Sequence, residues 1–125
     1  MIEDDNEVRR SLTLMLRARG CSLEVYESGI ELLATGYVPD VDCLIIDYKM
    51  PKIDGLKLLG RLRQEGISTP ALLLTGFYSA ALEKKAFEAG YARVLEKPVL
   101  ADHLMEIIHS ESLRAANNLV TKSSM

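Results

Sequence analysis

The sequence predicts an α/β domain whose five-stranded parallel sheet is doubly wound, with helices on both faces. Short apolar runs alternate five times with longer segments of helical spacing, which is typical of parallel strands joined by crossover helices. The runs are apolar throughout rather than at every second residue, as in strands that are buried on both faces. For this (βα)5 pattern we expect the strand order 2-1-3-4-5.

The expected strands are short. They comprise residues 1–2, 23–26, 43–46, 72–74 and 94–95. The first has only two residues before its acidic neighbours, where about five would be usual. Either this strand is unusually short or residues that precede it are missing from this chain.

Helical spacing follows the first two strands. The apolar stripe of the first helix consists of Val8, Leu12, Met15 and Leu16. Gly20 follows this stripe and is a typical helix stop. Residues 28–31 have the spacing of a capping box, so they begin a second, short helix that ends near Gly36.

Three further helices complete the pattern. Asp54 can cap the third, and Gly66 lies beyond its end. Ser79 can cap the fourth, which ends at Gly90, and the fifth begins near Asp102. Their inward-facing residues are expected to be Leu56, Leu59 and Leu62 in the third helix and Leu104, Ile107 and Ile108 in the fifth. Apolar periodicity is lost after residue 113, so we expect one domain over residues 1–113 and a frayed tail over residues 114–125.

Composition narrows the class of protein. The chain has 125 residues, which is room for one domain, and its net charge of −3 argues against a nucleic-acid-binding module. The longest apolar stretches are four residues, far short of the ~20 that span a membrane. The start, Met-Ile-Glu-Asp-Asp, is unlike a secretory leader. Because Cys21 and Cys43 form no metal-binding spacing, we interpret them as reduced core residues of a cytoplasmic protein.

Polar residues follow four of the five strands. Residues 3–5 (Glu-Asp-Asp) come after the first, Asp47 after the third, Thr75 after the fourth and Lys97 after the fifth. Because ligands of open α/β sheets bind beyond the carboxyl ends of the strands, these residues are expected to converge. Taken singly, the acids of residues 3–5 could be first-turn residues of a helix, Thr75 a turn residue and Lys97 a solvated lysine. Their joint placement favours a site.

The chemistry of such a group is restricted. Carboxylates without a His or Cys partner suit a hard cation such as Mg²⁺. A carboxylate can also attack phosphorus and form an aspartyl phosphate, whose oxygens a hydroxyl and an ammonium can hold. No glycine-rich nucleotide-binding motif is present. The pattern therefore predicts a phosphorylation site.

Four motifs together resemble the receiver domains of response regulators. The run Leu44-Ile-Ile-Asp47-Tyr-Lys-Met-Pro-Lys-Ile-Asp-Gly55 is similar to the phosphoacceptor segment of that family. Glu3-Asp-Asp, Leu74-Thr-Gly and Glu96-Lys-Pro are similar to the other three signatures, in order and at suitable spacing. The match covers about residues 1–113.

The resemblance implies a role for each matching residue. Asp47 accepts a phosphoryl group from a histidine kinase, a histidine phosphotransfer protein or a small phosphodonor. Asp4 ligates Mg²⁺ directly, Glu3 does so through water, and the backbone carbonyl of Lys49 is a further ligand; Asp5 is a less favoured substitute in the acidic pair. Thr75 and Lys97 hold the phosphoryl oxygens. The Lys97–Pro98 peptide is expected to be cis.

The chain also departs from the family pattern. Val94 stands where the family often has an aromatic switch residue, three before the lysine. Phe77 and Tyr78 could replace it, although packing is the more ordinary role of such aromatics. Lys49 and Phe77 occupy the positions at which the family tunes dephosphorylation.

The leading hypothesis is therefore a phosphoacceptor of a two-component or phosphorelay system that is not a dedicated enzyme. Its phosphorylation would change partner binding or homodimerisation through the face formed by the fourth helix, fifth strand and fifth helix. One alternative is a Mg²⁺-dependent phosphohydrolase that works through an aspartyl phosphate, although Lys49 stands where such enzymes need a second Asp. Another is an interaction module that has lost phosphorylation.

Overall fold

The centre of the molecule is a parallel sheet of three strands. The computed structural model describes residues 1–35 and 40–123. Strands β1 (Leu44–Asp47), β2 (Ala71–Thr75) and β3 (Arg93–Glu96) lie in the order β1-β2-β3. In register, Asp47 lies opposite Leu74, and Thr75 lies opposite Glu96. The carboxyl ends of the three strands therefore meet at one edge of the sheet.

The five-stranded sheet that the sequence predicts is not found in the described part of the chain. Residues 1–2 and 23–26 form no strands; instead, Ile2 makes single parallel bridges with Tyr26 on one side and with Ile46 on the other. A strand needs consecutive paired residues, and of the described residues ahead of the acidic segment only Ile2 forms such bridges. The five-stranded order is therefore not confirmed.

Residues 1–35 and 40–123 contain five helices, which cover the sheet. They are α1 (Asn6–Ala18), α2 (Gly29–Ala34), α3 (Gly55–Gln64), α4 (Ala80–Ala89) and α5 (Ala101–Ser123). The expected caps Ser28, Asp54 and Ser79 are confirmed, since each side chain accepts a backbone N–H of the first turn. The predicted end of the second helix near Gly36 lies outside the described residues, and α2 ends at Ala34.

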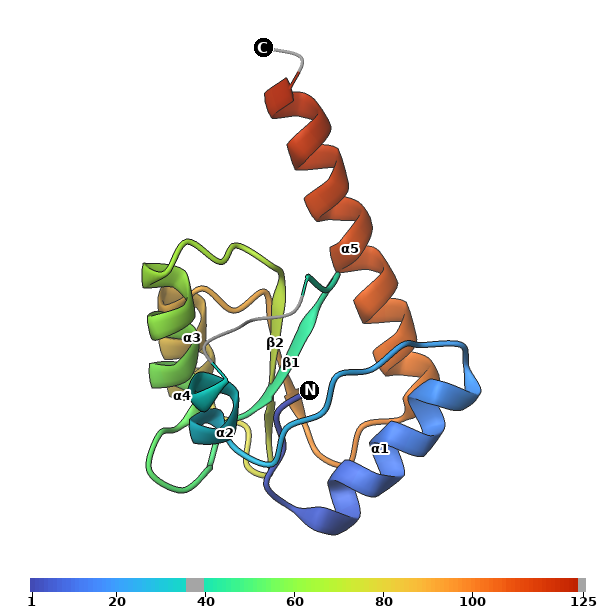
Figure 1. Ribbon diagram of the computed structural model, residues 1–125, viewed down its shortest axis with the longest axis vertical. Coiled ribbons are helices and arrows are strands. Elements are labelled where there is room, and N and C mark those ends of the chain that lie inside the picture. The colour runs from blue at the N-terminus through green and yellow to red at the C-terminus, as the bar shows by residue number, and fades with distance from the viewer. Residues whose placement is uncertain (36–39, 124–125) are drawn as a thin grey trace.

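The helices cover both faces of the sheet (Figure 1). Helices α2, α3 and α4 pack on one face, where Ile46 and Leu73 join their apolar residues. Helices α1 and α5 pack on the other, where Ile45 and Leu72 do so. Because neighbouring residues of β1 and β2 enter opposite cores, the buried positions ahead of Asp47 and Thr75 are all apolar, which is why these runs show no alternation.

Two details of the helical stripes differ from expectation. Met15 is 42% exposed, so the buried stripe of α1 is carried by Leu12 and Leu16. In α3, Leu58 is buried together with Leu59 and Leu62, whereas Leu56 is only partly buried. Both helices are therefore rotated slightly from the orientation that the stripes predicted.

Helix α5 extends further than the sequence pattern indicated. Its backbone is helical to Ser123, where a frayed tail was expected from residue 114. Figure 1 shows these last turns extending beyond the rest of the domain. Helix formation requires favourable backbone propensity but no apolar stripe, and the run Ala115-Ala116 supplies that propensity. The domain boundary at residue 113 stays a prediction. No helix of the described residues is long and apolar enough to span a membrane.

The start of α3 packs directly against the end of β1. The Gly55 N–H donates to the carbonyl of Tyr48, and the buried Tyr91 hydroxyl donates to the carbonyl of Gly55 at 2.7 Å. A Cβ atom at Gly55 would lie 2.6 Å from the Asp47 carbonyl oxygen and 2.8 Å from Cδ1 of Leu73. The absence of a side chain at Gly55 therefore allows α3 to approach Asp47.

We expect Gly55→Ala to lower the free energy of unfolding by about 1–3 kcal/mol, because the added methyl group meets backbone that cannot move freely. Urea denaturation measures the change. Gly60→Ala is the matched control in the same helix, where a Cβ has nothing within 4 Å. This control is expected to raise stability by about 1 kcal/mol, as for other helix-interior glycines. Equal effects of the two substitutions would contradict the close approach.

Candidate functional site

The side chain of Lys97 joins two buried carboxylates. Its Nζ atom lies 2.9 Å from Oε1 of Glu3 and 2.9 Å from Oδ1 of Asp47. Glu3 is fully buried, Asp47 is 4% exposed and the Lys97 side chain is 19% exposed. Three segments far apart in the sequence thus meet at the carboxyl edge of the sheet, as predicted.

The backbone that carries Glu3 and Asp4 is held on two sides. The Asp47 N–H donates to the carbonyl of Ile2 at 2.8 Å, and this bond places the acidic segment beside the end of β1. On the other side, Nη1 of Arg9 donates to the carbonyl of Glu3 at 2.9 Å and to that of Asp4 at 3.4 Å. The sequence alone does not indicate this role of Arg9, because the contacts with the Glu3 and Asp4 carbonyls depend on how the chain turns into α1.

Asp5 has a different role from its two neighbours. Its Oδ1 atom accepts the backbone N–H groups of Glu7 and Val8, so Asp5 is the N-cap of α1. Asp5 therefore serves the start of the helix rather than the acidic site, as the simpler interpretation of residues 3–5 proposed. Glu3 and Asp4 remain as the pair that lies beside Asp47.

Glu3, Asp4 and Asp47 form a compact carboxylate cluster. Each offers an oxygen atom within 4.8 Å of the others. Lys97 forms ion pairs with Glu3 and Asp47, and when all three carboxyls are ionised the group carries an excess of two negative charges over this ammonium. Among the described residues, the buried Oε2 atom of Glu3 has no hydrogen-bond partner. Oxygen-only ligands, excess negative charge and an unpaired buried oxygen fit a hard divalent cation.

Burial changes the protonation of this group. The pKa of Asp47 is raised to about 7, chiefly by burial and next by the neighbouring Asp4 carboxyl, while Lys97 opposes the rise. Burial also raises the pKa of Glu3, against the hydrogen bond from Lys97. For Lys97, burial alone would lower the pKa, but the hydrogen bonds to Asp47 and Glu3 outweigh it and the net change is upward.

A cavity of about 470 Å³ opens beside Asp47. Its lining includes Thr75 and Lys97, and also residues of the loop and helix that follow β2. Thr75 is 4% exposed. Its hydroxyl oxygen accepts a hydrogen bond from the Phe77 N–H at 3.1 Å, and its hydroxyl proton is donated to the Phe77 carbonyl oxygen at 3.3 Å. The Lys97 N–H donates to the Thr75 carbonyl, which aligns the two residues. The cavity leaves space for a small group against the Asp47 carboxylate.

The remaining candidates lie around this cavity. Lys49 is exposed and lines it together with Phe77. Phe77 is 83% exposed, so the packing role considered for it is wrong. Tyr78 is 41% exposed; its hydroxyl donates to Glu83 at 2.5 Å and its N–H to Glu96 at 2.8 Å. The Lys97–Pro98 peptide is cis, as expected.

Comparisons with known proteins show which family the chain resembles. Residues 1–109 match the family described as the response regulator receiver domain. Among curated relatives, the transcriptional regulatory protein FixJ of Azorhizobium caulinodans is 35% identical over 98 residues, which cover 78% of this chain and 46% of FixJ. The C4-dicarboxylate transport transcriptional regulatory protein DctR of Rhodobacter capsulatus is 32% identical over 109 residues, covering 86% of this chain and 55% of DctR. The chain spans about half the length of these relatives.

Solved structures agree with this match. A Francisella response regulator receiver domain superposes with a TM-score of 0.84 at 26% identity, covering 91% of this chain and 94% of that one. FixJ-N superposes with a TM-score of 0.76 at 33% identity, covering 89% of this chain and 90% of the other.

The raised pKa of Asp47 predicts how stability depends on pH when a chelator removes divalent cations. Between about pH 4 and pH 7 the folded chain holds a proton that the unfolded chain releases, so the free energy of unfolding should fall as the pH rises, by about 1–4 kcal/mol. Asp47→Asn removes the titrating group and should flatten this slope. Denaturant titrations across the pH range measure it.

Asp102→Asn is the control for the charge change, because the Asp102 side chain is exposed and its ion pair with Arg19 lies at the surface, away from Asp47. This variant should keep the slope of the unsubstituted chain. Identical slopes for the Asp47→Asn variant and the unsubstituted chain would contradict the burial argument.

Proposed function

Because this chain belongs to the response regulator receiver domain family, we propose that it is a phosphoacceptor switch of a two-component or phosphorelay system. In this proposal Asp47 accepts the phosphoryl group from a histidine kinase or a histidine phosphotransfer protein. The single observation that carries it is the Asp47 carboxylate at the end of β1, joined to Lys97 at 2.9 Å and open to a cavity.

The proposed transfer needs only the groups of this site and a donor. An oxygen of the ionised Asp47 carboxylate attacks phosphorus, an O–P bond forms, and the P–N bond of a phosphohistidine (or the P–O bond of an acyl phosphate) breaks. The departing imidazole or carboxylate keeps the electron pair and takes any proton it needs from solvent. In this proposal Lys97 and the Thr75 hydroxyl hold the equatorial oxygens, and their position in the lining of the cavity beside Asp47 supports this role.

Mg²⁺ is the proposed cofactor. Glu3, Asp4 and Asp47 would hold it, together with the backbone carbonyl of Lys49. When bound, the ion neutralises negative charge on the carboxylates and on the incoming phosphoryl group. The excess of negative charge and the unpaired Oε2 atom of Glu3 support this assignment.

The proposed output is a change of surface rather than a further reaction. A phosphoryl group on Asp47 would compete for the Thr75 hydroxyl, which now contacts the backbone of Phe77. The affected surface is the face of α4, β3 and α5, where β3 is the fifth strand of the sequence prediction, and partner binding or homodimerisation would follow. The relatives FixJ and DctR are named as transcriptional regulators, and we propose that this receiver likewise relays to an output without itself contacting nucleic acid. The five-stranded order 2-1-3-4-5 and the cytoplasmic location remain part of this proposal.

We expect the purified chain to gain one phosphoryl group when it is incubated with acetyl phosphate and Mg²⁺, as measured by intact mass. Asp47→Asn should abolish the gain, and EDTA should reduce it at least tenfold because three carboxylates then repel the donor.

Asp54→Asn is the matched control, since it makes the same chemical change in a nearby acid whose role is to cap α3, and Asn caps equally well. It should leave the mass gain intact. Phosphorylation that survives in the Asp47→Asn variant would refute the proposed acceptor. Steady turnover of a phosphate ester by the unsubstituted chain would instead favour the phosphohydrolase alternative.

Arg9 should affect Mg²⁺ binding through the backbone it holds. Arg9→Met removes the donors to the Glu3 and Asp4 carbonyls, so the acidic segment loses its fixed position and the dissociation constant for Mg²⁺ should rise about 5- to 50-fold. Isothermal titration measures it. Arg10→Met changes the same charge at an exposed neighbour and should leave the affinity within about twofold. Equal losses in both variants would indicate only a general charge effect.

A further inference from the structure

The loop between β1 and α3 begins and ends beside Asp47. Tyr48, its first residue, donates its N–H to the Leu74 carbonyl of β2 at 2.8 Å, and its own carbonyl accepts the Gly55 N–H at 2.8 Å. Gly55 is the first residue of α3 and packs against the Asp47 carbonyl. The two ends of the loop therefore meet at one point, and the backbone of Lys49 continues directly from it.

This meeting point is held from two sides. On the side of the sheet, the bond to Leu74 fixes Tyr48. On the side of α3, the Tyr91 hydroxyl donates to the Gly55 carbonyl at 2.7 Å. Tyr91 is 3% exposed, and its ring lies in the apolar core to which α3 and α4 both contribute. The buried ring therefore gives the hydroxyl a fixed position from which it holds the start of α3.

The hydrogen bond from Tyr91 is additional to those that α3 makes for itself. A carbonyl in the first turn of an α-helix accepts the N–H of the residue four further on, and its second lone pair stays free for another donor. The Gly55 carbonyl thus needs no side chain to be satisfied. Phenylalanine would fill the core as well as the ring of Tyr91 does, so core packing does not explain the hydroxyl. What the bond adds is a fixed position for the start of α3.

Tyr91 is itself anchored where α3 and α4 both end. Its N–H donates to the Ala86 carbonyl at 2.9 Å, directly after Gly90, whose φ of 110° ends α4. From α3, Arg63 donates through Nη2 to the Gly90 carbonyl at 3.3 Å and through Nη1 to the Ile67 carbonyl at 2.9 Å. The ends of the two helices thus form a fixed base from which the Tyr91 side chain reaches the start of α3.

We propose that Tyr91 is a positioning residue of the Asp47 site, whose hydroxyl fixes Gly55 and, through it, the backbone that presents the Asp47 carboxylate and the Lys49 carbonyl. The inference rests on the proposed function, in which the first group accepts the phosphoryl group and both ligate Mg²⁺. Without the hydroxyl, the start of α3 is free to move from Asp47, and the oxygen ligands lose their fixed spacing. Burial raises the pKa of the Tyr91 phenol, which keeps it protonated as a donor.

Tyr91→Phe tests the proposal, because it removes the hydroxyl, keeps the ring and leaves the Gly55 carbonyl with its helical partner. Two measurements need no phosphodonor: amide hydrogen exchange in EDTA and isothermal titration with Mg²⁺. We expect the Gly55 amide to exchange at least about fivefold faster relative to the amide of Leu73 in the central strand β2. The dissociation constant for Mg²⁺ should rise about 3- to 10-fold.

Arg63→Met tests the base on which Tyr91 stands. It removes the donors to the Gly90 and Ile67 carbonyls, so exchange of the Tyr91 and Gly55 amides should be at least about threefold faster. Arg61→Met makes the same charge change at an exposed position of α3 and should leave both amides unchanged.

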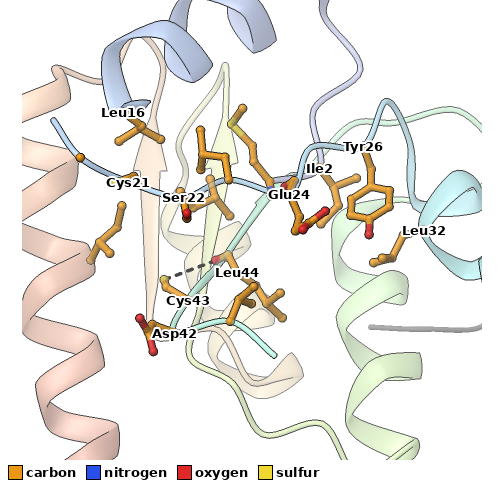
Figure 2. A pocket seen from close by; sticks show the side chains of 16 residues that line it. Ile2, Leu16, Cys21, Ser22, Glu24, Tyr26, Leu32, Asp42, Cys43 and Leu44 are labelled. Carbon is orange, nitrogen blue, oxygen red and sulfur yellow. Dashed lines mark hydrogen bonds between the residues drawn. The ribbon is translucent and has the colours of Figure 1, made fainter. Parts of the chain in front are cut away.

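Leu44→Val separates positioning from a general loss of stability. Leu44 lies in the same apolar core as Tyr91 but at the amino end of β1, where it lines a cavity of about 440 Å³ (Figure 2). Removing a methylene group there should lower the melting temperature, while the dissociation constant for Mg²⁺ should stay within about twofold.

Three results would overturn the proposal: unchanged exchange at Gly55 in the Tyr91→Phe variant, unchanged Mg²⁺ affinity in that variant, or an equal loss of affinity in the Leu44→Val variant. Intact mass after incubation with acetyl phosphate tests the proposed function separately. A chain whose Mg²⁺ affinity depends on Tyr91 but which gains no phosphoryl group would refute Asp47 as the acceptor and uphold the positioning role of Tyr91.

Discussion

The ion pairs of Lys97 with Glu3 and Asp47 are the interaction on which the site depends. Burying two carboxylates is unfavourable by itself, and one ammonium at 2.9 Å from each offsets only part of that desolvation. The raised pKa values of both acids are the consequence. The fold thus keeps a negative, poorly solvated group at the carboxyl edge of the sheet. Such a group gains more from an added cation than solvated surface acids would.

The fold holds this unfavourable arrangement through contacts that do not involve the charges. Gly55 allows α3 to approach the Asp47 backbone, and the Tyr91 hydroxyl donates a hydrogen bond to the Gly55 carbonyl. The Asp47 N–H is bonded to the Ile2 carbonyl, so the position of Asp47 and that of the acidic segment are set by one ladder. Backbone hydrogen bonds and close packing fix the carboxylates before any ligand arrives, which is the preorganisation that electrostatic binding requires.

Local features of the sequence predicted most of these parts. The caps Ser28, Asp54 and Ser79 depend on bonds within one turn, so their residue type was sufficient. The convergence of Glu3, Asp4, Asp47 and Lys97 followed from strand order alone. Arg9 could not be predicted, because its contacts with the Glu3 and Asp4 carbonyls depend on how the acidic segment turns into α1. The parallel α/β fold is confirmed, but the five-stranded order is not, since a pattern marks apolar runs and does not say how many residues lie side by side to form a ladder.

Thr75 links the site to the surface in a way that a phosphoryl group on Asp47 would change. The hydroxyl has one proton to donate, and its donor contact is now the Phe77 carbonyl at 3.3 Å, longer than a strong hydrogen bond. A phosphoryl oxygen is a stronger acceptor than a peptide carbonyl, so donation to it is favoured in the phosphorylated state we propose. Phe77 is 83% exposed and few packing contacts oppose its movement. The weak bond at Thr75 and the unburied ring at Phe77 therefore allow the loop after β2 to respond without loss of core packing, while Leu73 and Leu74, buried just before it, keep the strand in place.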